Sequence, residues 1–579
     1  MDPKLREEQM RLAEELLFEG KTLPSFAKGL YAGLFDAQRV MPFPSMTAEQ
    51  QAEMDSYLAT LRTWMDANLD PDAIDRNAEI PDHVIRGLAE LKLLSCTIGR
   101  EYGGLGFSQM MYCRAVEEVA RRCGSTALFI NAHQSIGLKA LILFGTPKQK
   151  ERWLTALARG EVLAAFALTE PEAGSDAANV QTRAEYDAAR DVYIINGKKQ
   201  WITNGGIAGV LTLMARTDDG KITAFLVTPD MPGFKVTEVA LEKVGMRGTK
   251  TAKLEFVNME VPSENIIGEK GKGLKLALTV LDYGRTTFGA MCTGSAKYCL
   301  DRVLEHVRTR VQFKQPIGSF ELVKEKVARI AAYVYAMDSM TQLTAGLVDR
   351  EQEEYMLETA MLKVFTSDAL WEILFETMQI FGGRSFFTDE PFERMMRDAR
   401  LGTIGEGSND VLRAFIGVVG MRDVGMKFKA VADAIKSPTL GLGKLLGLGK
   451  DSLRKWFVTP AVPVKHADLQ LEAQQFAERI KQLGLAVQRL IVHYREEVLE
   501  RQLELNRVAE AAMNLYGVTA VLSRLDTELH NGKAGAKDLA VGKHFCRLAF
   551  DKIDRALGSI GQNNHDAEIR AVAKELTGL

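Results

Sequence analysis

The sequence has few cysteines and histidines, and neither residue type is arranged as a metal site. Its six cysteines form no CxxC pair and lie in apolar or helical surroundings. Its eight histidines are scattered, and no HExxH motif or Cys/His cluster occurs. We therefore expect reduced thiols in a cytosolic or mitochondrial-matrix compartment, and no protein-bound metal.

The chain also lacks an excess of charge of one sign. Over 579 residues the formal net charge is -3, and 46% hydrophobic with 26% charged residues is ordinary for a soluble globular protein. A general nucleic-acid binder normally carries a strong basic excess. We therefore expect no nucleic-acid partner, and the length allows several domains.

A long apolar run is missing as well. The chain begins with the acidic stretch MDPKLREEQMRLAEELL, which has neither the apolar core of a signal peptide nor the Arg/Ser bias of a transit peptide. No uninterrupted apolar run reaches the roughly 18 residues of a membrane-spanning helix. We expect a protein that is not exported and whose contact with a membrane is at most peripheral, and the initiating methionine favours a bacterial source.

Two glycine-rich stretches do not have the spacing of a nucleotide-binding fingerprint. YGGLGFS, at 102–108, lacks both the GxGxxG spacing and a preceding strand. GLGKLLGLGKDS, at 441–452, has Lys444 where a P-loop requires glycine and Asp451 where it requires Ser or Thr. Neither stretch predicts a nucleotide site.

The periodicity of apolar residues changes several times along the chain. Stretches such as TPKQKERWLTALARG repeat apolar residues at helical spacing, whereas runs such as KITAFLVTP are short, β-rich and divided by turns at Asn196-Gly197, Asp219-Gly220 and Pro232-Gly233. We predict a mainly α fold with a small antiparallel β domain. The predicted segments are an N-terminal extension (1–46), a helical domain (47–161), a middle β domain (162–272), a helical bundle (273–426), a basic linker (427–465) and a C-terminal helical domain (466–579).

The predicted linker 427–465 has an unusual composition. It holds eight Lys or Arg against two Asp, in a chain whose net charge is negative. Leu442, Leu445, Leu446, Leu453, Trp456 and Phe457 would fall near one face of a helix, which is typical of an amphipathic helix at a membrane surface. A flexible, glycine-rich basic spacer explains the same residues, and the composition leaves both interpretations open.

The stretch GTIGEGSND, at 402–410, places one carboxylate, Glu406, between Gly405 and Gly407 at the start of an apolar helix. The ordinary interpretation is a helix entry, in which Ser408 or Asn409 caps the helix and Glu406 complements its dipole. The alternative is a functional carboxylate, because glycine on both sides lets another group approach the backbone closely.

The β-rich part contains groups that could hold a planar cofactor. ALTEPEAGSDAAN, at 167–179, offers the hydroxyls of Thr169 and Ser175, together with Gly174 and a run of backbone N–H groups. In KKQWITNGG, Trp201 and Thr203 lie two residues apart and would point to the same face of a strand. Each feature by itself is more often structural.

Seven segments together resemble the acyl-CoA dehydrogenase family, and specifically its very-long-chain branch with an additional C-terminal domain. In chain order they are AHQSIGLKALILFGT, AFALTEPEAGSDAANVQT, INGKKQWITNGG, VPSENIIGEKGKG, RVQFKQPI, MQIFGGRSF and GEGSNDVLR. The resemblance implies a bound FAD that takes a hydride from the β-carbon of an acyl-CoA, and a glutamate that takes the α-proton to give a trans-2-enoyl-CoA. Glu406 matches that glutamate.

The resemblance also implies the remaining site residues. Arg285, in LDYGRTTFG, resembles the arginine beside the catalytic carboxylate, and Gly407 leaves room for the thioester. Burial beside an acyl chain should raise the pKa of Glu406 toward neutrality. The expected FAD-binding residues are Phe166, Leu168, Thr169, Gly174, Ser175, Trp201, Thr203, Arg310, Phe313, Gln379, Gly382, Gly383 and Ser408.

The expected partners follow from the same resemblance. They are a long-chain or very-long-chain acyl-CoA, a second copy of the chain that shares the ADP half of FAD, and electron-transferring flavoprotein as electron acceptor. In this branch the basic linker associates with the inner membrane, which favours the amphipathic-helix interpretation of 427–465. We expect the protein in the bacterial cytoplasm or on the cytoplasmic face of the inner membrane, or in the mitochondrial matrix or inner membrane if the chain is a processed eukaryotic form.

Two departures and two rival functions remain. Gly405 stands where the family usually has a bulky aromatic residue, which bears on the preference for chain length or branching. Gly284 occupies the position that carries the base in the isovaleryl branch, and glycine cannot serve as a base. The rivals are an acyl-CoA oxidase, which would share the base, and a scaffold for respiratory-complex assembly with little activity.

Overall fold

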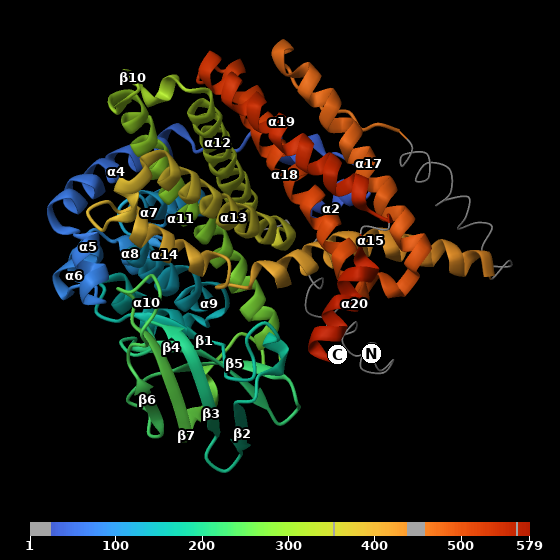
Figure 1. Cartoon of the computed structure of the whole chain (residues 1–579). Coiled ribbons are helices and arrows are strands. Elements are labelled where there is room, and N and C mark those ends of the chain that lie inside the picture. Colours follow the sequence, from blue (N-terminus) through green and yellow to red (C-terminus); the bar gives the residue numbers. More distant parts are fainter. Residues whose placement is uncertain (1–24, 351–353, 437–457, 563–564) are drawn as a thin grey trace.

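The computed structural model describes residues 25–350, 354–436, 458–562 and 565–579. The first described part of the chain is helical, and its first helix lies among the C-terminal helices, apart from most of the others (Figure 1). Threonine capping boxes, which satisfy the first free N–H groups of a helix, begin two of these helices: Thr47 pairs with Gln50, and Thr146 with Gln149. The helices are α2 (Phe26–Tyr31), α3 (Ala37–Val40), α4 (Ala48–Asn68), α5 (Pro71–Asn77), α6 (Asp82–Glu90), α7 (Gln109–Ala120), α8 (Gly124–Asn131), a π-helix (Ala132–Gly137), α9 (Lys139–Phe144) and α10 (Pro147–Ala158).

A twisted sheet follows and forms the lower part of Figure 1. Its order is β6-β7-β3-β2-β4-β5-β8, with β1 paired to β4. Most pairs are antiparallel as predicted, but β1–β4 and β2–β4 are parallel, because the long connection between β1 and β2 lets the chain cross over. The strands are β1 (Ala164–Ala167), β2 (Arg183–Asp187), β3 (Val192–Thr203), β4 (Val210–Thr217), β5 (Ile222–Val227), β6 (Phe234–Glu238), β7 (Thr251–Pro262) and β8 (Ile266–Ile267).

The prediction of a turn at Asn196-Gly197 is wrong, because both residues lie inside β3. The pairing of β3 with β7 shifts between Ile195 and Gly197, so the pair forms an irregularity in the ladder. A Cβ atom at Gly197 would lie 2.4 Å from Oγ1 of Thr182. Glycine is therefore required here for close packing of backbone and side chain rather than for a chain reversal.

A long helix, α11 (Gly273–Thr309), joins the sheet to a helical bundle. Its 37 residues span about 55 Å at the usual rise per residue. A small hairpin of β9 (Val311–Gln312) and β10 (Gln315–Pro316) follows it. The other bundle helices are α12 (Glu321–Asp349), α13 (Met356–Phe381), α14 (Phe392–Gly402) and α15 (Asn409–Lys436).

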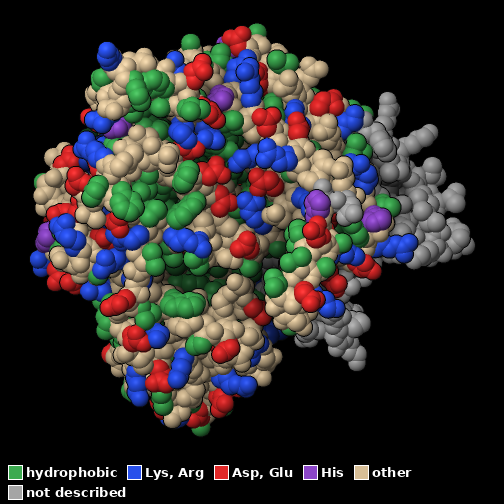
Figure 2. Space-filling view, viewed as in Figure 1, with side chains coloured by type: hydrophobic (Ala, Val, Ile, Leu, Met, Phe, Trp, Pro, Cys, Tyr) green, Lys and Arg blue, Asp and Glu red, His purple; other side chains and the backbone are tan. Residues whose placement is uncertain are grey.

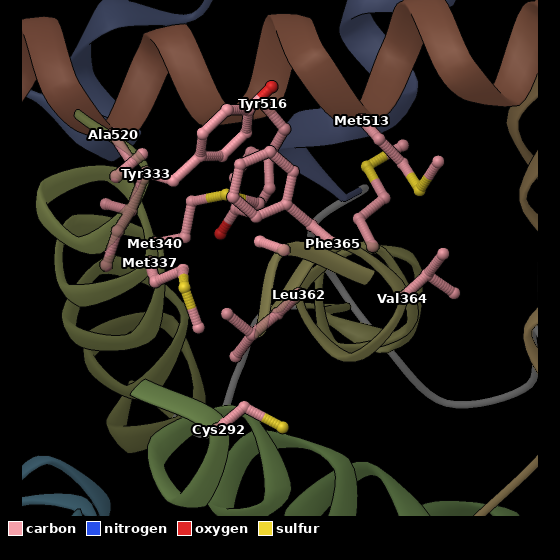
Figure 3. Packing of buried hydrophobic residues seen from close by; sticks show 14 of the residues in the cluster. Cys292, Tyr333, Met337, Met340, Leu362, Val364, Phe365, Met513, Tyr516 and Ala520 are labelled. Carbon is pink, nitrogen blue, oxygen red and sulfur yellow. The ribbon is translucent and has the colours of Figure 1, made fainter. Parts of the chain in front are cut away.

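The last helices pack directly on the bundle. In Figure 3, Met513, Tyr516 and Ala520 of α18 face side chains of α12 and α13. The ring of Phe545 in α19 contacts Tyr333 and Phe365 at centroid distances of 5.9 and 6.0 Å. Of the last helices, α17 (Gln470–Tyr494), α18 (Gln502–His530) and α19 (Ala536–Ser559) therefore share one hydrophobic core with the bundle, whereas the apolar side chains Ile569, Val572 and Leu576 of α20 (Asp566–Thr577) are exposed.

The predicted basic linker is described only in part. Residues 427–436 continue α15 without a break, so the helix runs past the predicted boundary at 426. Residues 437–457, which contain the predicted apolar face, lie outside the described residues.

The buried interior agrees with the predicted redox state of the thiols. All six cysteines are buried and free. One helical stretch, Gly124–Phe144, is long and apolar enough to span a membrane by length and composition, but 78% of its most apolar window is buried inside the protein. This stretch therefore belongs to the core around the site described below.

Candidate active site

Glu406 lies in the tight connection between α14 and α15. Its backbone is left-handed, with φ of 56°, and Gly407 follows with φ of 94°. The hydroxyl of Ser408 accepts a hydrogen bond from the N–H of Val411 at 3.4 Å, so the helix-cap interpretation also holds for Ser408. A left-handed conformation is unfavourable for glutamate, and such strain is retained where the surroundings enforce it.

The carboxylate of Glu406 points into the interior of the protein. Its Oε1 accepts a hydrogen bond of 2.7 Å from Nδ2 of Asn131, and its Oε2 is buried without a hydrogen-bond partner. A Cβ atom added at Gly284 would lie 2.9 Å from Oε2 and 2.8 Å from the side chain of Ile136. Gly284, which the sequence analysis noted only as unable to serve as a base, thus leaves the space that the carboxylate occupies.

Burial raises the pKa of Glu406 to about 7, as the sequence analysis expected. Nearby Lys363 and Arg285, and the hydrogen bond from Asn131, oppose this rise because they favour the charged form. A carboxyl group with a pKa near neutrality can take and release a proton at physiological pH.

Lys363 of α13 holds the loop from behind. Its Nζ donates to the carbonyl oxygen of Gly407 at 2.6 Å and to Oδ1 of Asn409 at 2.8 Å. Burial lowers the pKa of Lys363 to about 8, and Glu406 opposes that change. The side chain is fully buried, so Lys363 places a fixed donor beneath the glutamate loop, residues 403–408 between α14 and α15.

Arg285 lies beside the same loop, as the resemblance implied. Its Nε donates to the carbonyl oxygen of Glu406 at 3.4 Å, a long hydrogen bond. A second guanidinium nitrogen lies 3.2 Å from the carboxylate of Asp282, which also accepts from the hydroxyl of Thr359. The guanidinium of Arg285 is thus held near Glu406 by its contacts with a backbone carbonyl and Asp282, rather than by an ion pair with the Glu406 carboxylate.

The first group of predicted cofactor residues lies in the sheet. Phe166 lies in β1, and its side chain is buried. The backbone carbonyl of Leu168 accepts a hydrogen bond from Nζ of Lys199, and that of Thr169 accepts one from the N–H of Gln200. These contacts tie the segment that follows β1 to the end of β3. Lys199 also forms a fully buried ion pair of 2.6 Å with Glu170.

The end of β3 is irregular, whereas the sequence predicts a regular strand there. The pairing with β7 shifts between Lys199 and Ile202, and Trp201 has a left-handed φ of 57°. This bulge turns the indole outward, where it is 61% exposed, while Ile202 stays in the core and Thr203 is half-buried. Trp201 thus presents an aromatic face next to the segment of Leu168 and Thr169.

Gly174 and Ser175 lie in the exposed loop after β1. A Cβ atom added at Gly174 would meet nothing within 4 Å, so its surface is open. An exposed aromatic plane, buried apolar neighbours and an open loop with a hydroxyl and backbone N–H groups suit a ligand with an aromatic ring system and phosphates. The sheet residues therefore fit a flavin nucleotide.

The second group of predicted cofactor residues lies at the opposite end of α11. Phe313 occupies the tip of the β9–β10 hairpin with a left-handed backbone and is 88% exposed. Stacking of His306 on Phe381, at 4.0 Å, joins the end of α11 to the loop after α13. Arg310, Gln379, Gly382 and Gly383 are exposed there. In Figure 1 the β9–β10 hairpin lies at the end of the molecule opposite the sheet, so one chain holds this group apart from the sheet group.

A cavity of about 280 Å³ lies along α11. It begins at Phe288 and Gly402, which stand four residues from Gly284 and Glu406 in the chain, and the ring of Phe288 packs against Gly402. The cavity continues along one face of α11, lined by Phe288, Met291, Cys292, Ser295 and Tyr298. Charged side chains of α4, α5, α14 and the turn after α7 line the cavity as well, namely Asp66, Asp72, Arg121, Arg122, Arg394 and Asp398.

Sequence reasoning missed two residues of the site, Asn131 and Lys363. Asn131 stands directly before the recognised segment AHQSIG, but its partner Glu406 is 275 residues away. Lys363 lies in an apolar helical run, and a buried lysine in such a run carries no local signal.

Figure 2 shows acidic and basic side chains interspersed over one face of the molecule, and hydrophobic side chains around the recess between the sheet and the helical part.

Comparison with known proteins agrees with this geometry. Three profiles of the acyl-CoA dehydrogenase family match: the N-terminal domain at residues 51–161, the middle domain at 165–259 and the C-terminal domain at 271–420. A fourth, described as the ACAD9/ACADV C-terminal domain, matches residues 467–578.

Individual relatives cover nearly the whole chain. The mouse very long-chain specific acyl-CoA dehydrogenase is 32% identical over 95% of this chain and 87% of its own length. The probable acyl-CoA dehydrogenase FadE10 of Mycobacterium tuberculosis is 32% identical over 99% of this chain and 92% of its own. An acyl-CoA dehydrogenase from Bacillus anthracis, solved with FAD, is 26% identical, covers 95% of both chains and superposes with a TM-score of 0.79. The chain therefore belongs to the acyl-CoA dehydrogenase family.

Proposed function

We propose that this chain catalyses the FAD-dependent α,β-dehydrogenation of long-chain acyl-CoA to trans-2-enoyl-CoA, a step of fatty-acid β-oxidation, with Glu406 as the base. The observation that carries the proposal is the buried carboxyl of Glu406, whose Oε2 has no hydrogen-bond partner and whose pKa is raised to about 7. This group stands where the family resemblance places the base, and the neighbouring sheet fits a flavin.

The chemistry assigned to Glu406 is removal of the α-proton of the thioester. The proton would move to Oε2, and the electron pair of the C–H bond would develop as enolate charge toward the carbonyl oxygen. Burial excludes water, which strengthens the interaction of fixed dipoles and the nearby cations Lys363 and Arg285 with that charge. When bound at Leu168, Thr169, Ser175, Trp201 and Thr203, FAD supplies the hydride acceptor for the β-carbon.

The cavity along α11 supports a long acyl chain as substrate. From Phe288 to Tyr298 the helix rises about 15 Å, which is about the thickness of one leaflet of acyl chains in a bilayer. The cavity lining includes the apolar side chains of Phe288, Met291 and Leu370, and Phe288 lies one helical turn from Gly284, which contacts Glu406. We therefore assign this cavity to the acyl tail.

We further propose a homodimer in which each FAD bridges two chains. Phe313, Arg310 and the loop of Gly382 and Gly383 are exposed and lie about one length of α11 from the sheet. A cofactor that contacts both groups must therefore take them from different copies. Phe313, Phe386 and Phe387 are exposed apolar residues of this end and suit burial against a second chain.

Two further proposals concern partners. Contact with a membrane through 427–465 rests on composition alone, because most of that segment lies outside the described residues. Binding of the chain to anionic vesicles, lost on exchange of the lysines and arginines of 437–457 for glutamine, would test it. Electron-transferring flavoprotein as acceptor rests on the family resemblance.

Turnover of a series of saturated acyl-CoAs, from butyryl-CoA to substrates longer than palmitoyl-CoA, tests the proposed activity. We expect products two mass units lighter than the substrates, with electrons passed to an artificial acceptor and the best rates for long chains. Hydrogen peroxide formed in air at the full rate of turnover would favour the oxidase instead. A protein that binds FAD but converts no acyl-CoA would favour the assembly scaffold.

A further inference from the structure

Asn131 is the residue of the site whose role the family resemblance does not supply. It is the last residue of α8 and is fully buried. Its Nδ2 donates to Oε1 of Glu406 at 2.7 Å, the length of a charge-assisted hydrogen bond. Its Oδ1 is buried without a partner, so the amide is oriented by the base rather than by a network of its own.

The position of Asn131 is fixed by the π-helix that follows it. Nδ1 of His133 accepts from the N–H of Ala164, so His133 carries its proton on Nε2, which donates to the carbonyl of Leu94 at 2.9 Å. These two contacts anchor the π-turn to β1 and to the segment before α7. Wide turns of this kind often occur at functional sites because they redirect a side chain.

The remaining groups around Glu406 act on its carboxylate without hydrogen-bonding it. Within the part of the chain that the structure describes, the carboxylate accepts a single hydrogen bond, the one from Asn131. Lys363 reaches the backbone carbonyl of Gly407 and Arg285 reaches that of Glu406 itself. The other titratable groups that bear on Glu406 or on these two cations are Asp282 and Cys292 of α11, Asp368 of α13 and Tyr112 of α7.

We propose that Asn131 is a positioning residue for this reaction: it holds Oε1 of Glu406 by a hydrogen bond to the charged form and thereby leaves Oε2 as the atom that accepts the substrate proton. The inference rests on the proposed function of Glu406 as base. A carboxylate with one oxygen fixed cannot rotate freely. Oε2 therefore stays next to Gly284, where it has no hydrogen-bond partner. Because the hydrogen bond is stronger to the charged carboxylate than to the neutral carboxyl, it also keeps the base from becoming protonated too readily.

Two variants test the proposal. Asn131→Leu removes the donor and keeps the branching and the number of side-chain heavy atoms. Asn131→Asp keeps the shape and places a second carboxyl beside the base, so it serves where the leucine fails to fold. Each should raise the pKa of Glu406, by about one to two pH units for the leucine, since a hydrogen bond to a charged group favours that form by an equivalent amount.

The measurement is the pH dependence of anaerobic flavin reduction by palmitoyl-CoA. We expect the midpoint of the acidic limb to move upward in both variants, with rates that recover toward the wild-type value at alkaline pH. Asn514→Leu is the matched control, because Nδ2 of this buried asparagine donates to Oε1 of Glu510 at 3.0 Å, a carboxylate that forms no hydrogen bond with Glu406 in the described part of the chain. It should leave the midpoint unchanged.

A second readout does not depend on turnover. The carbonyl band of the protonated Glu406 carboxyl, identified by its absence in Glu406→Gln, is followed by infrared spectroscopy against pH in wild type and variants. An unchanged midpoint of that band in Asn131→Leu or Asn131→Asp would overturn the proposal, whatever the rate. A wild type that reduces no flavin would instead contradict the proposed function, and the infrared titration would still decide the role of Asn131.

Discussion

Glu406 combines two conditions that are individually unfavourable, a left-handed backbone and a carboxyl group whose Oε2 is buried. The first places the side chain inward from a tight connection, and the second raises its pKa to about 7. Both conditions are maintained by neighbours that hold the backbone rather than neutralise the carboxylate, chiefly Lys363 and Arg285. The residue is thus kept in a state suited to proton transfer at the expense of local stability.

Gly284 provides the space in which the base lies, which leads to a first prediction. In Gly284→Ala the new Cβ would come within 2.9 Å of Oε2, so the carboxylate must move. A displacement of this size should lower the rate of flavin reduction roughly ten- to a hundredfold. Gly425→Ala in α15, where an added Cβ meets nothing within 4 Å, should keep the wild-type rate. Equal rates in the two variants would contradict the assigned position of the base.

The raised pKa of Glu406 also predicts a pH-dependent difference in stability. Between about pH 4.5 and 7 the folded state holds a proton at Glu406 that the unfolded state has lost, so stability contributed by this group falls as the pH rises. Glu406→Gln has no such loss and should become more stable than wild type by up to roughly 3 kcal/mol at pH 8, while matching it near pH 4. Unfolding midpoints of both proteins against pH provide the measurement, and a constant difference would count against a buried, proton-binding Glu406.

At the scale of elements, α13 supports the loop that carries the base. Lys363 donates to Gly407 and Asn409, and Asn409 in turn donates to Ser367 and Asp368 of the same helix. The glutamate loop is therefore fastened to one face of α13, and this helix transmits its position to the site.

Lys363→Met removes that fastening. The carbonyl of half-buried Gly407 and the buried Oδ1 of Asn409 would lose their donor, which should lower the free energy of unfolding by about 1 to 3 kcal/mol. Loss of a neighbouring positive charge should also move the acidic limb of the pH–rate profile upward. Lys297→Met, which breaks contacts of 2.5 and 2.9 Å to Glu117 and Asp338, is a control that should destabilise the protein without moving the limb. A profile that stays in place in Lys363→Met would contradict its role.

Some features of the helices and strands can be predicted from the sequence, and others cannot. Periodicity and turn residues predict the helix–sheet–helix order, and the motifs predict Glu406, Arg285 and the flavin segment. The bulge at Trp201 could not be predicted, because it depends on how β3 pairs with β7. The contact of Asn131 with Glu406 depends on tertiary packing of α8 against the glutamate loop, which leaves no local pattern.

At the scale of the whole molecule, the C-terminal helices and the bundle form one core. A chain of contacts links them to the loop that carries Glu406. Arg413 of α15 forms ion pairs with Glu510 of α18 and with Asp368 of α13, and Asp368 also accepts a hydrogen bond from Asn409. The last helices therefore stabilise the helix at whose start the glutamate loop lies.

The proposed sharing of FAD between two chains is also a whole-molecule property. Trp201→Ala and Arg310→Glu should each lower the FAD content of the pure homodimers. When both variants are co-expressed, every mixed dimer would contain one site with neither change, so about half of its sites should bind FAD and turn over substrate. Content and activity that stay at the level of the parents would show that each cofactor is held within one chain.

The central claim is that Glu406 removes the substrate proton in an FAD-dependent dehydrogenation. Its most direct test is the anaerobic visible spectrum of the purified protein before and after palmitoyl-CoA, with Glu406→Gln prepared to the same FAD content. We predict that palmitoyl-CoA bleaches the flavin of the wild type, whereas the flavin of Glu406→Gln stays oxidised. Bleaching of the variant at the wild-type rate would contradict the role of Glu406, and a wild type that no saturated acyl-CoA bleaches would contradict the dehydrogenase itself.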